Sequence, residues 1–475
     1  MTFPWPDSPP TDAQRAAFAD AVVRPYWLDA LPSRDPLPQL DGPAEADLCI
    51  VGAGFTGLWA ALHAKADDPD RDVVVLEADT VGFGASGRNG GFALGSLTHG
   101  IENGLARFAD EIDELERLGR ENFAGFLADL ERHGIDCDVE LTGDLSVALE
   151  PHELAWIPES AELYERFGHE YEVFDQAGIR EEVSSPTYLG GFWAKTDAAV
   201  LDPGKLCAGL AGAALAAGVR IHERTRATRI VDDGAGVRVL TPTGHVRAGR
   251  VLLATSAYPP LLRAIRRYVA PVYDYALMTE PLSPAQRDAI GWRRRQGLSD
   301  MANQFHYYRL TKDERILFGG YDAVYRYGGP VRTDLDDDEQ AFGMLSQHFF
   351  TTFPQLEGVR FTHRWGGAID TCSRFAVFFG TAHRGRVAYA VGYTGLGVVS
   401  TRFGARVALD LLDGRQTEAM RLRYVRSKPV PFPPEPLRSG VIQLTRNRLG
   451  AADRNAGRRG LWLRTLDRLG LGFDS

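Results

Sequence analysis

Cysteine, lysine and long apolar runs are all scarce in this sequence of 475 residues. The four cysteines lie far apart and form neither a C-x-x-C pair nor a metal-ligand spacing. We therefore expect no disulfide framework and no metal site, as is typical of proteins in the reducing cytoplasm. No apolar run approaches the roughly 18 residues that cross a membrane. Residues 1–44 also lack the basic start and apolar centre of a signal peptide.

The charge balance narrows the range of partners. A formal net charge of −10 argues against a nucleic-acid partner, because phosphates repel an acidic surface. A hydrophobic content of 44% and an aromatic content of 10% are sufficient for large buried cores. At this length we expect two domains. These bounds indicate a soluble, enzyme-sized protein, and we expect it in the cytoplasm.

A glycine turn between two apolar runs stands near the start of the chain. The runs 48–51 and 73–76 predict buried strands, and the Ala- and Leu-rich segment 58–66 between them predicts a helix. The turn before this helix has the spacing G-x-G-x-x-G and consists of Gly52, Ala53, Gly54, Phe55, Thr56 and Gly57. Glu77 ends the second strand, 20 residues after Gly57. This is the dinucleotide-binding fingerprint, with pyrophosphate on the helix N-terminus and ribose hydroxyls on the acid.

A second glycine-rich stretch follows Glu77 and Ala78. It is too dense in glycine for a regular element, so its backbone N–H groups can approach a flat ligand closely. Its candidate contacts are Gly84, Ala85, Ser86, Gly87, Arg88, Asn89, Gly90 and Gly91. With this A-S-G-R-N-G-G segment, the chain resembles the D-amino-acid oxidase / glycine oxidase superfamily, in its gamma-glutamylputrescine-oxidase-like branch. The resemblance implies an FAD cofactor, with this segment lying against the flavin ring.

A third glycine turn, near the end of the chain, strengthens the resemblance. Residues 387–391 predict a strand, and 398–412 predict a helix. The turn between them contributes Gly392, Tyr393, Thr394, Gly395 and Gly397. The resemblance implies that this helix N-terminus points at the flavin pyrimidine, where it would stabilise negative charge on the reduced ring. It also implies that Ala227 contacts the adenine and that Thr255 lies beneath the cofactor.

The expected fold class is α/β, a Rossmann-like FAD-binding domain interleaved with an antiparallel-sheet α+β substrate domain. We assign 1–46 to an N-terminal extension, and 47–100, 196–270 and 361–425 to the FAD-binding domain. The substrate domain then takes 101–195 and 271–360. Within it we expect one long helix over 101–133, a strand over 138–149, helical structure over 151–183 and a helix over 335–353. The tail, 426–475, holds ten Lys and Arg against four Asp and Glu and predicts short amphipathic helices. These would pack on the acidic body, or else touch an anionic membrane surface or a redox partner.

The chain departs from the family where the substrate binds. Glycine-oxidase-like members have W-x-G-x-R-P, in which the arginine fixes the substrate carboxylate. The matching stretch here starts at Trp365 and has Ile369 in place of that arginine. Isoleucine cannot clamp a carboxylate, so Arg309, with Tyr308 beside it, is the candidate replacement. Asp370 could instead hold a cationic amine, or cap a helix or form a salt bridge.

Some relatives bind the flavin covalently, and some place a lysine over it to activate oxygen. Neither feature has a clear counterpart in this sequence. Gly367 and Ala368 stand where sarcosine oxidases carry a flavin-linking cysteine, so we expect noncovalent FAD. The chain has five lysines, and none lies on the expected strand near 272–278. Whether oxygen or another acceptor takes the electrons is left open.

These features predict an FAD-dependent enzyme that oxidises a C–N bond of an amine or amino acid. Hydride transfer to flavin gives an imine, which hydrolyses to an aldehyde or keto acid. The alternative within the same chemistry is an oxidase or dehydrogenase for D-amino acids or N-methyl amino acids, of the glycine and sarcosine type. A non-catalytic flavin-binding subunit and an NAD-dependent dehydrogenase are remoter alternatives.

Overall fold

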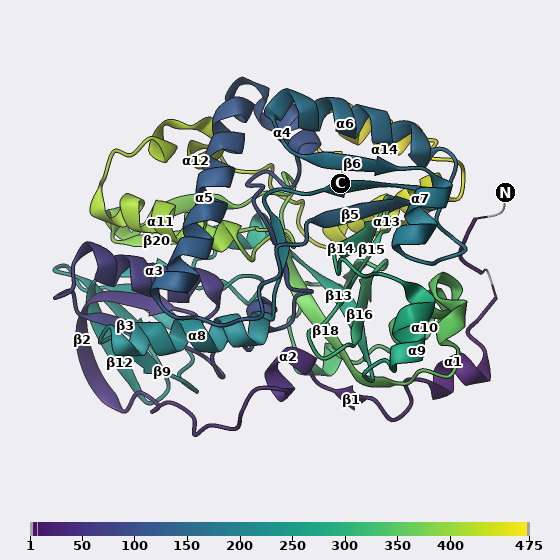
Figure 1. Cartoon of the computed structure of the whole chain (residues 1–475). Helices are drawn as coiled ribbons and strands as arrows, with labels where there is room; N and C mark the ends of the chain where they lie inside the picture. The colour runs from purple at the N-terminus through teal and green to yellow at the C-terminus, as the bar shows by residue number, and fades with distance from the viewer. Residues whose placement is uncertain (1–2, 7, 473–475) are drawn as a thin grey trace.

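The computed structural model describes residues 3–6 and 8–472, which form two large sheets (Figure 1). The first sheet has a parallel core of five strands, four of which contain a buried apolar run. In spatial order they are β9 (Arg220–His222), β3 (Val73–Leu76), β2 (Gly42–Val51), β12 (Gly244–Leu253) and β20 (Val387–Val391). Antiparallel strands extend it, with β11 (Val237–Leu240) on β12, β10 (Arg229–Asp232) beyond it, and β19 (Phe378–Ala382) on β20.

Helices cover one face of this parallel core. They are α3 (Phe55–Asp67), α8 (Pro203–Ala216) and α11 (Ser400–Asp413), with α5 (Ile112–Arg132) packed against α11. Their apolar side chains join those of β2 and β3 in one large core. The helices α3 and α11 both begin at the carboxyl ends of their preceding strands, so their N-termini meet at one edge of the sheet.

The second sheet is mostly antiparallel and lies beside the first (Figure 1). Its strand order is β1 (Val22–Val23), β18 (Phe361–Thr371), β13 (Ala270–Thr279), β16 (Ile316–Gly320), β15 (His306–Leu310), β14 (Gly297–Asp300), β5 (Asp144–Ala148), β7 (Gly190–Ala194) and β6 (Tyr171–Phe174). β17 (Val324–Tyr325) pairs with β13. The helices α9 (Pro284–Ile290) and α10 (Glu339–Thr352) cover its outer face with an aromatic core. The sheet is therefore covered on one side, and its other side is free to line a site.

Smaller elements complete the chain. β4 (Phe92–Leu94) pairs with β8 (Ala198–Val200). The other α-helices are α1 (Asp12–Ala16), α2 (Tyr26–Asp29), α4 (Ile101–Phe108), α6 (Trp156–Phe167), α7 (Gln176–Glu182), α12 (Arg423–Arg426), α13 (Leu437–Asp453) and α14 (Leu461–Arg468). No helix in the described part of the chain has the length and apolarity needed to cross a membrane.

The α/β fold class is confirmed, and the strands predicted at 73–76 and 387–391 have those bounds. Two predictions were wrong. The long helix over 101–133 is divided at Phe108, whose backbone leaves the helical region (φ −136°, ψ 35°) while its ring packs on Tyr424. The helical segment over 151–183 is interrupted by β6, because α6 ends at Gly168 in the left-handed conformation.

We propose that the two sheets mark the two domains, with two changes to the division expected from sequence. β18 was assigned to the FAD-binding domain but pairs with β13 along most of its length. α5 was assigned to the substrate domain, yet its apolar face packs into the core of the parallel sheet. On this division, the chain passes between the two domains more often than the sequence suggested.

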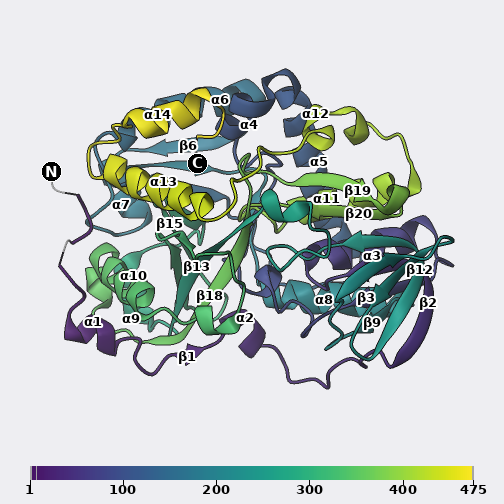
Figure 2. The ribbon, with the colours of Figure 1, turned by 180° about the vertical axis from the view of Figure 1, so that it is seen from behind.

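The described parts of both terminal segments pack on the body. Trp27 is buried and its Nε1 donates a 2.9 Å hydrogen bond to the Asn89 carbonyl. In the tail, Asp453 accepts from the backbone N–H groups of Asn303 and Gln304 at 3.1 and 3.0 Å. Arg446 forms an ion pair with Asp322. Figure 2 shows α13 and α14 lying along the body, so the expectation that the tail packs on its own domain is met.

Candidate cofactor and substrate site

One large cavity lies between the two sheets. Its volume is about 1810 Å³. A typical small-molecule pocket measures roughly 300–1,000 Å³, so this cavity has room for a dinucleotide and a separate substrate. The glycine turns of the first sheet line one end, and the open face of the second sheet lines the other.

Glu77 is fixed at the carboxyl end of β3. Its Oε2 accepts a hydrogen bond of 2.8 Å from the Ala53 N–H, and its Oε1 accepts one of 3.0 Å from the Asp79 N–H. Burial raises the pKa of this carboxyl group, and the two backbone hydrogen bonds oppose the rise. The side chain lines the cavity in the place expected for a ribose-binding acid.

The glycines of the first turn are required by close packing. Gly52 has φ +108°, and a Cβ there would lie 2.5 Å from the Ala254 carbonyl oxygen. A Cβ at Gly57 would collide with the Gly52 carbonyl oxygen, so this glycine lets α3 pack on β2. A Cβ at Gly54 would project towards the cavity and meet Ser86 Oγ at 2.8 Å. The N-terminus of α3, where the Phe55 N–H donates to Ser86 Oγ at 2.9 Å, and this bare backbone fit a pyrophosphate.

Arg88 ties the second glycine stretch to the other sheet. Its Nη1 donates to Asp336 Oδ2 at 2.6 Å and to the Gly366 carbonyl at 2.8 Å. Trp365 Nε1 donates in return to the Arg88 carbonyl at 2.9 Å. The loop that is expected against the flavin ring is therefore held rigidly at the junction of the two sheets.

Asp370 organises the third glycine turn. Its Oδ2 accepts a hydrogen bond of 2.7 Å from the Gly392 N–H, and the N–H groups of Tyr393 and Thr394 also favour its ionised form. Burial outweighs these contacts and raises the pKa of Asp370 to about 6. The backbone has positive φ at Gly392 (+88°), Thr394 (+54°) and Gly395 (+92°). This conformation leads the chain into the N-terminus of α11 at the cavity wall.

Most of the predicted cofactor residues line the cavity. They are Gly52, Gly54, Phe55, Thr56, Glu77, Ala78, Gly84, Ala85, Ser86, Arg88, Asn89, Gly90, Ala227, Thr255, Tyr393, Thr394, Gly395 and Gly397. The others, which do not reach it, are Ala53, Gly57, Gly87, Gly91 and Gly392. Packing explains their places: Gly87, for example, lies so close to the Gly82 carbonyl that no side chain would fit. We propose that these five shape the turns and that the lining residues contact FAD.

Of the predicted substrate residues, Trp365 and Ile369 lie at the cavity. Asp370 borders it too, but its carboxylate is occupied by the Gly392 turn. The suggestion that Asp370 holds a cationic amine is therefore corrected: it holds backbone N–H groups instead. Ile369 pairs with Val272 on β13.

Arg309 and Tyr308 do not reach the cavity, and this is a second correction. Arg309 is 1% exposed, and its guanidinium donates to the Leu201 carbonyl and, at 3.5 Å, to that of Gly91. Burial lowers the pKa of Arg309 to about 10. Tyr308 points to the opposite face of β15, where its hydroxyl lies 2.7 Å from that of Tyr188.

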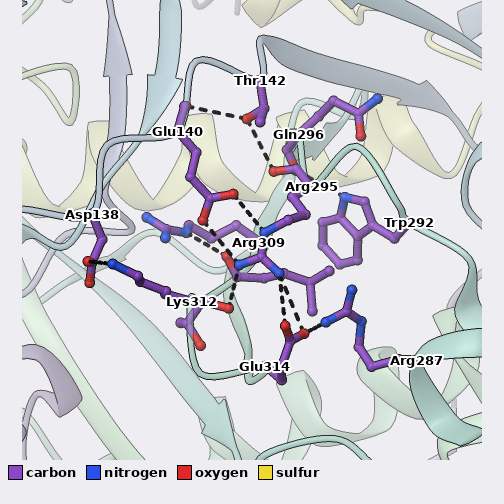
Figure 3. Close-up of polar contacts among 12 residues, drawn as sticks. Asp138, Glu140, Thr142, Arg287, Trp292, Arg295, Gln296, Arg309, Lys312 and Glu314 are labelled. Atoms are coloured by element: carbon purple, nitrogen blue, oxygen red, sulfur yellow. Dashed lines mark hydrogen bonds and ion pairs between the residues drawn. The ribbon is translucent and has the colours of Figure 1, made fainter. Parts of the chain in front are cut away.

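Figure 3 shows the surroundings of Arg309. The side chain lies beside a polar cluster in which Arg295 Nε donates to Glu140 at 2.6 Å. Lys312 and Asp138 form a neighbouring ion pair at 2.8 Å. Arg309 therefore supports the chain behind the glycine loop, and no carboxylate clamp forms from it.

The sequence interpretation missed a polar pair on the open face of the second sheet. Tyr307 Oη donates a 2.6 Å hydrogen bond to Asp274 Oδ2, and both residues line the cavity. Burial raises the pKa of Asp274 to about 6. The alternation of side chains along β15 contained the signal, because it places Tyr307 on the opposite face from Tyr308.

A row of paired residues crosses this sheet, and all of them except Gly319 line the cavity. In strand order they are Trp365, Ala276, Gly319, Tyr307, Ser299, Ser146 and Phe192. Beyond this row the tail closes the cavity, with Val441, Thr445 and Leu449 of α13 and Leu466 of α14 in its lining. This role of the tail was also missed, since an amphipathic pattern does not say where a helix docks.

Comparison with known proteins agrees with this geometry. The family model described as "FAD dependent oxidoreductase" matches residues 47–411. A gamma-glutamylputrescine oxidoreductase of Escherichia coli is 34% identical over 421 residues, covering 86% of this chain and 92% of the relative. A probable oxidoreductase, OrdL, of Haemophilus influenzae is 30% identical over 406 residues, covering 82% and 88%.

Solved structures resemble the fold at lower identity. Glycine oxidase from Geobacillus kaustophilus superimposes with a TM-score of 0.66 at 19% identity, covering 79% of this chain and 96% of that one. L-proline dehydrogenase from P. horikoshii gives 0.64 at 18% identity, covering 79% and 95%. These two similarities concern the fold.

Proposed function

Because the chain belongs to the DAO family of FAD-dependent oxidoreductases, we propose that it oxidises the C–N bond of an amine without an α-carboxylate. The product is an imine, which water hydrolyses to an aldehyde and a smaller amine or ammonia. The observation that carries this proposal is Ile369 on the cavity wall, where carboxylate-binding relatives have arginine. The similarity to a gamma-glutamylputrescine oxidoreductase supports it, since that name describes a derivative of a diamine.

The chain offers separate groups for each part of FAD. Glu77 would hold the ribose hydroxyls, and the turn from Gly52 to Gly57 would hold the pyrophosphate. The N-terminus of α11 would favour negative charge at the pyrimidine edge. Bound FAD supplies the acceptor for the hydride that leaves the carbon next to the amine nitrogen. We propose that the cofactor is bound noncovalently and that oxygen or another acceptor reoxidises it.

The amine must lose a proton before its C–H bond can give up hydride. We propose that Tyr307 and Asp274 remove it. The substrate N–H donates to Tyr307 Oη, whose own proton moves along the 2.6 Å hydrogen bond to Asp274 Oδ2. With a pKa of about 6, Asp274 is ionised at neutral pH and able to accept this proton. Proton transfer by a positioned side chain of this kind contributes about 10²–10⁴-fold to rate.

Ile369 disfavours the binding of carboxylate-bearing substrates. A carboxylate placed against this side chain would lose its hydration without gaining a partner, which costs several kcal/mol. Arg88, which lines the cavity beside β18, is already occupied by Asp336 and the Gly366 carbonyl. An uncharged alkyl chain suffers no such penalty at Ile369.

Anaerobic bleaching of the flavin tests the proposal. Putrescine and longer amines are expected to reduce the bound flavin faster than glycine, sarcosine or D-alanine. Tyr307→Phe should slow reduction at least about tenfold without loss of FAD. Tyr308→Phe is the matched control, because its hydroxyl points away from the cavity. Rapid reduction by sarcosine or D-alanine with no response to amines would establish the amino-acid alternative instead.

A further inference from the structure

The part of the cavity wall formed by β5 carries an unpaired acidic group. Asp144 lies on β5, and its side chain lines the cavity. Its Oδ1 is buried and has no hydrogen-bond partner. Within the described residues, Asp144 also takes part in no ion pair. A buried carboxylate without a partner is costly and is therefore unusual unless a ligand completes it.

A second unpaired oxygen lies on the same wall. Thr196 lies two residues beyond Ala194, the last residue of β7, and Ala194 is paired with Asp144. Thr196 Oγ1 is buried without a hydrogen-bond partner, and the residue lines the cavity. Two acceptor oxygens thus face one region of the cavity.

Aromatic rings complete this region. Tyr164 of α6 and Phe192 of β7 both line the cavity, and their ring centroids are 4.8 Å apart in an edge-to-face arrangement. Burial raises the pKa of Tyr164, and the charges of Asp144, Glu102 and Glu116 raise it further. Aromatic faces beside a carboxylate are the groups that bind ammonium ions.

The charged groups near this region are occupied by one another or by the backbone. His169 lies 3.5 Å from Asp197 and 3.2 Å from Glu116, and these contacts raise its pKa to about 9. Arg120 Nη1, which also lines the cavity, donates to the Phe167 carbonyl. Since none of these contacts engages Asp144, its carboxylate is left for a ligand.

We propose that Asp144, with Thr196, Tyr164 and Phe192, binds a second, protonated nitrogen at the far end of an elongated amine substrate. The structure thus assigns a substrate class to the proposed oxidation, on which this inference rests: diamines and monosubstituted diamines. Burial raises the pKa of Asp144 to about 7, and a bound ammonium would restore the ionised form.

The position of Asp144 explains why the substrate must be long. Two strand-to-strand steps separate β5 from β15, which carries Tyr307, the group that takes the substrate N–H in the proposed oxidation. At about 4.8 Å a step, this corresponds to roughly 10 Å across the strands. Tyr307 is in register with Ser146 through Ser299, and Asp144 lies two residues away from Ser146 along β5. A short amine oxidised at Tyr307 cannot reach Asp144, whereas a longer α,ω-diamine has a charged group for each place.

The test compares α,ω-diamines with 1-aminoalkanes of equal carbon number, from four to twelve carbons, on the purified flavoprotein. The native protein should prefer diamines, measured as the rate of anaerobic flavin reduction against concentration, with an optimum at one chain length. Asp144→Asn should weaken diamine binding at least about tenfold and leave 1-aminoalkanes within about twofold. Ser146→Ala, two residues along the same wall, is the matched control. An unchanged diamine preference in Asp144→Asn overturns the inference.

A binding measurement separates this inference from the oxidation itself. Butyltrimethylammonium has no N–H bond to lose, so its binding can be followed by calorimetry without turnover. Binding to the native flavoprotein that is lost in Asp144→Asn supports the cation site even if no amine reduces the flavin, and in that case the proposed oxidation alone fails. Equal binding to both proteins argues against the site. Thr196→Val keeps the test valid if Asp144→Asn folds poorly, and a several-fold weaker affinity is expected.

Discussion

Asp370 Oδ2 and the Gly392 N–H are joined by a 2.7 Å hydrogen bond, which connects β18 of one sheet to the glycine turn after β20 of the other. The turn carries three residues with positive φ, so its conformation depends on such fixed contacts. The contact also explains why a buried acid stands beside Ile369.

Replacing Asp370 should therefore loosen the cofactor site. Asp370→Ala removes a charge-assisted hydrogen bond worth about 1–3 kcal/mol, and FAD affinity should fall about tenfold or more. Equilibrium titration of the apoprotein with FAD measures this. Asp334→Asn, which removes an exposed ion pair with Arg332, is the control and should leave affinity unchanged.

Gly54→Val should yield mostly apoprotein. The new side chain would enter the cavity beside Ser86 and occupy the place of the pyrophosphate. Gly212→Val is the control, because Gly212 is an exposed helix residue whose added Cβ would meet no atom within 4 Å. The ratio of flavin to protein absorbance decides the outcome, and full FAD in Gly54→Val would refute the fingerprint assignment.

Heat precipitation of the native protein should leave the flavin in solution, because we expect FAD to be bound noncovalently. Flavin in the pellet would indicate a covalent link.

His169 should make stability depend on pH. Its hydrogen bonds to Asp197 and Glu116 raise its pKa from 6.5 to about 9 in the folded protein. The stabilisation is fully present below about pH 6.5 and is lost as the pH rises through about 9. We expect a loss of about 1–2 kcal/mol over this range, after allowing for solvent screening.

Urea unfolding at pH 6 and pH 9.5 checks this prediction. His169→Gln should remove most of the change in unfolding free energy between the two pH values, while replacement of the exposed His133 by Gln should not. The same pH dependence in the native protein and in His169→Gln would show that other groups cause it.

Local patterns were sufficient to predict the cofactor half of the molecule. The strands at 73–76 and 387–391 are uninterrupted apolar runs bounded by polar or glycine residues, and both are buried parallel strands. The glycine-rich segments follow these strands within a few residues, so their relative positions are set by short-range geometry. The fingerprint acid Glu77 is held by the turn that precedes it, which keeps that site local as well.

The substrate half could not be predicted in the same way, because its contacts join distant segments. Alternation identified β15 as a strand, but it did not show that Leu201 and Gly91 cover Arg309 and take its hydrogen bonds. The tail has an evident helical pattern, yet its place over the cavity depends on Arg446 meeting Asp322, more than a hundred residues away. Such pairings become visible only in the folded chain.

Ile369→Arg should shift the preference towards carboxylate-bearing substrates. The new guanidinium would face the cavity and could bind a carboxylate through two parallel hydrogen bonds, which a neutral side chain cannot do. We expect the rate of flavin reduction by sarcosine or D-alanine, relative to that by putrescine, to rise at least about tenfold. Ile369→Leu controls for packing and should leave the ratio unchanged. If the native protein already prefers these amino acids, the role assigned to Ile369 is wrong. If Arg309→Met then abolishes their turnover while the flavin stays bound, Arg309 is the carboxylate clamp.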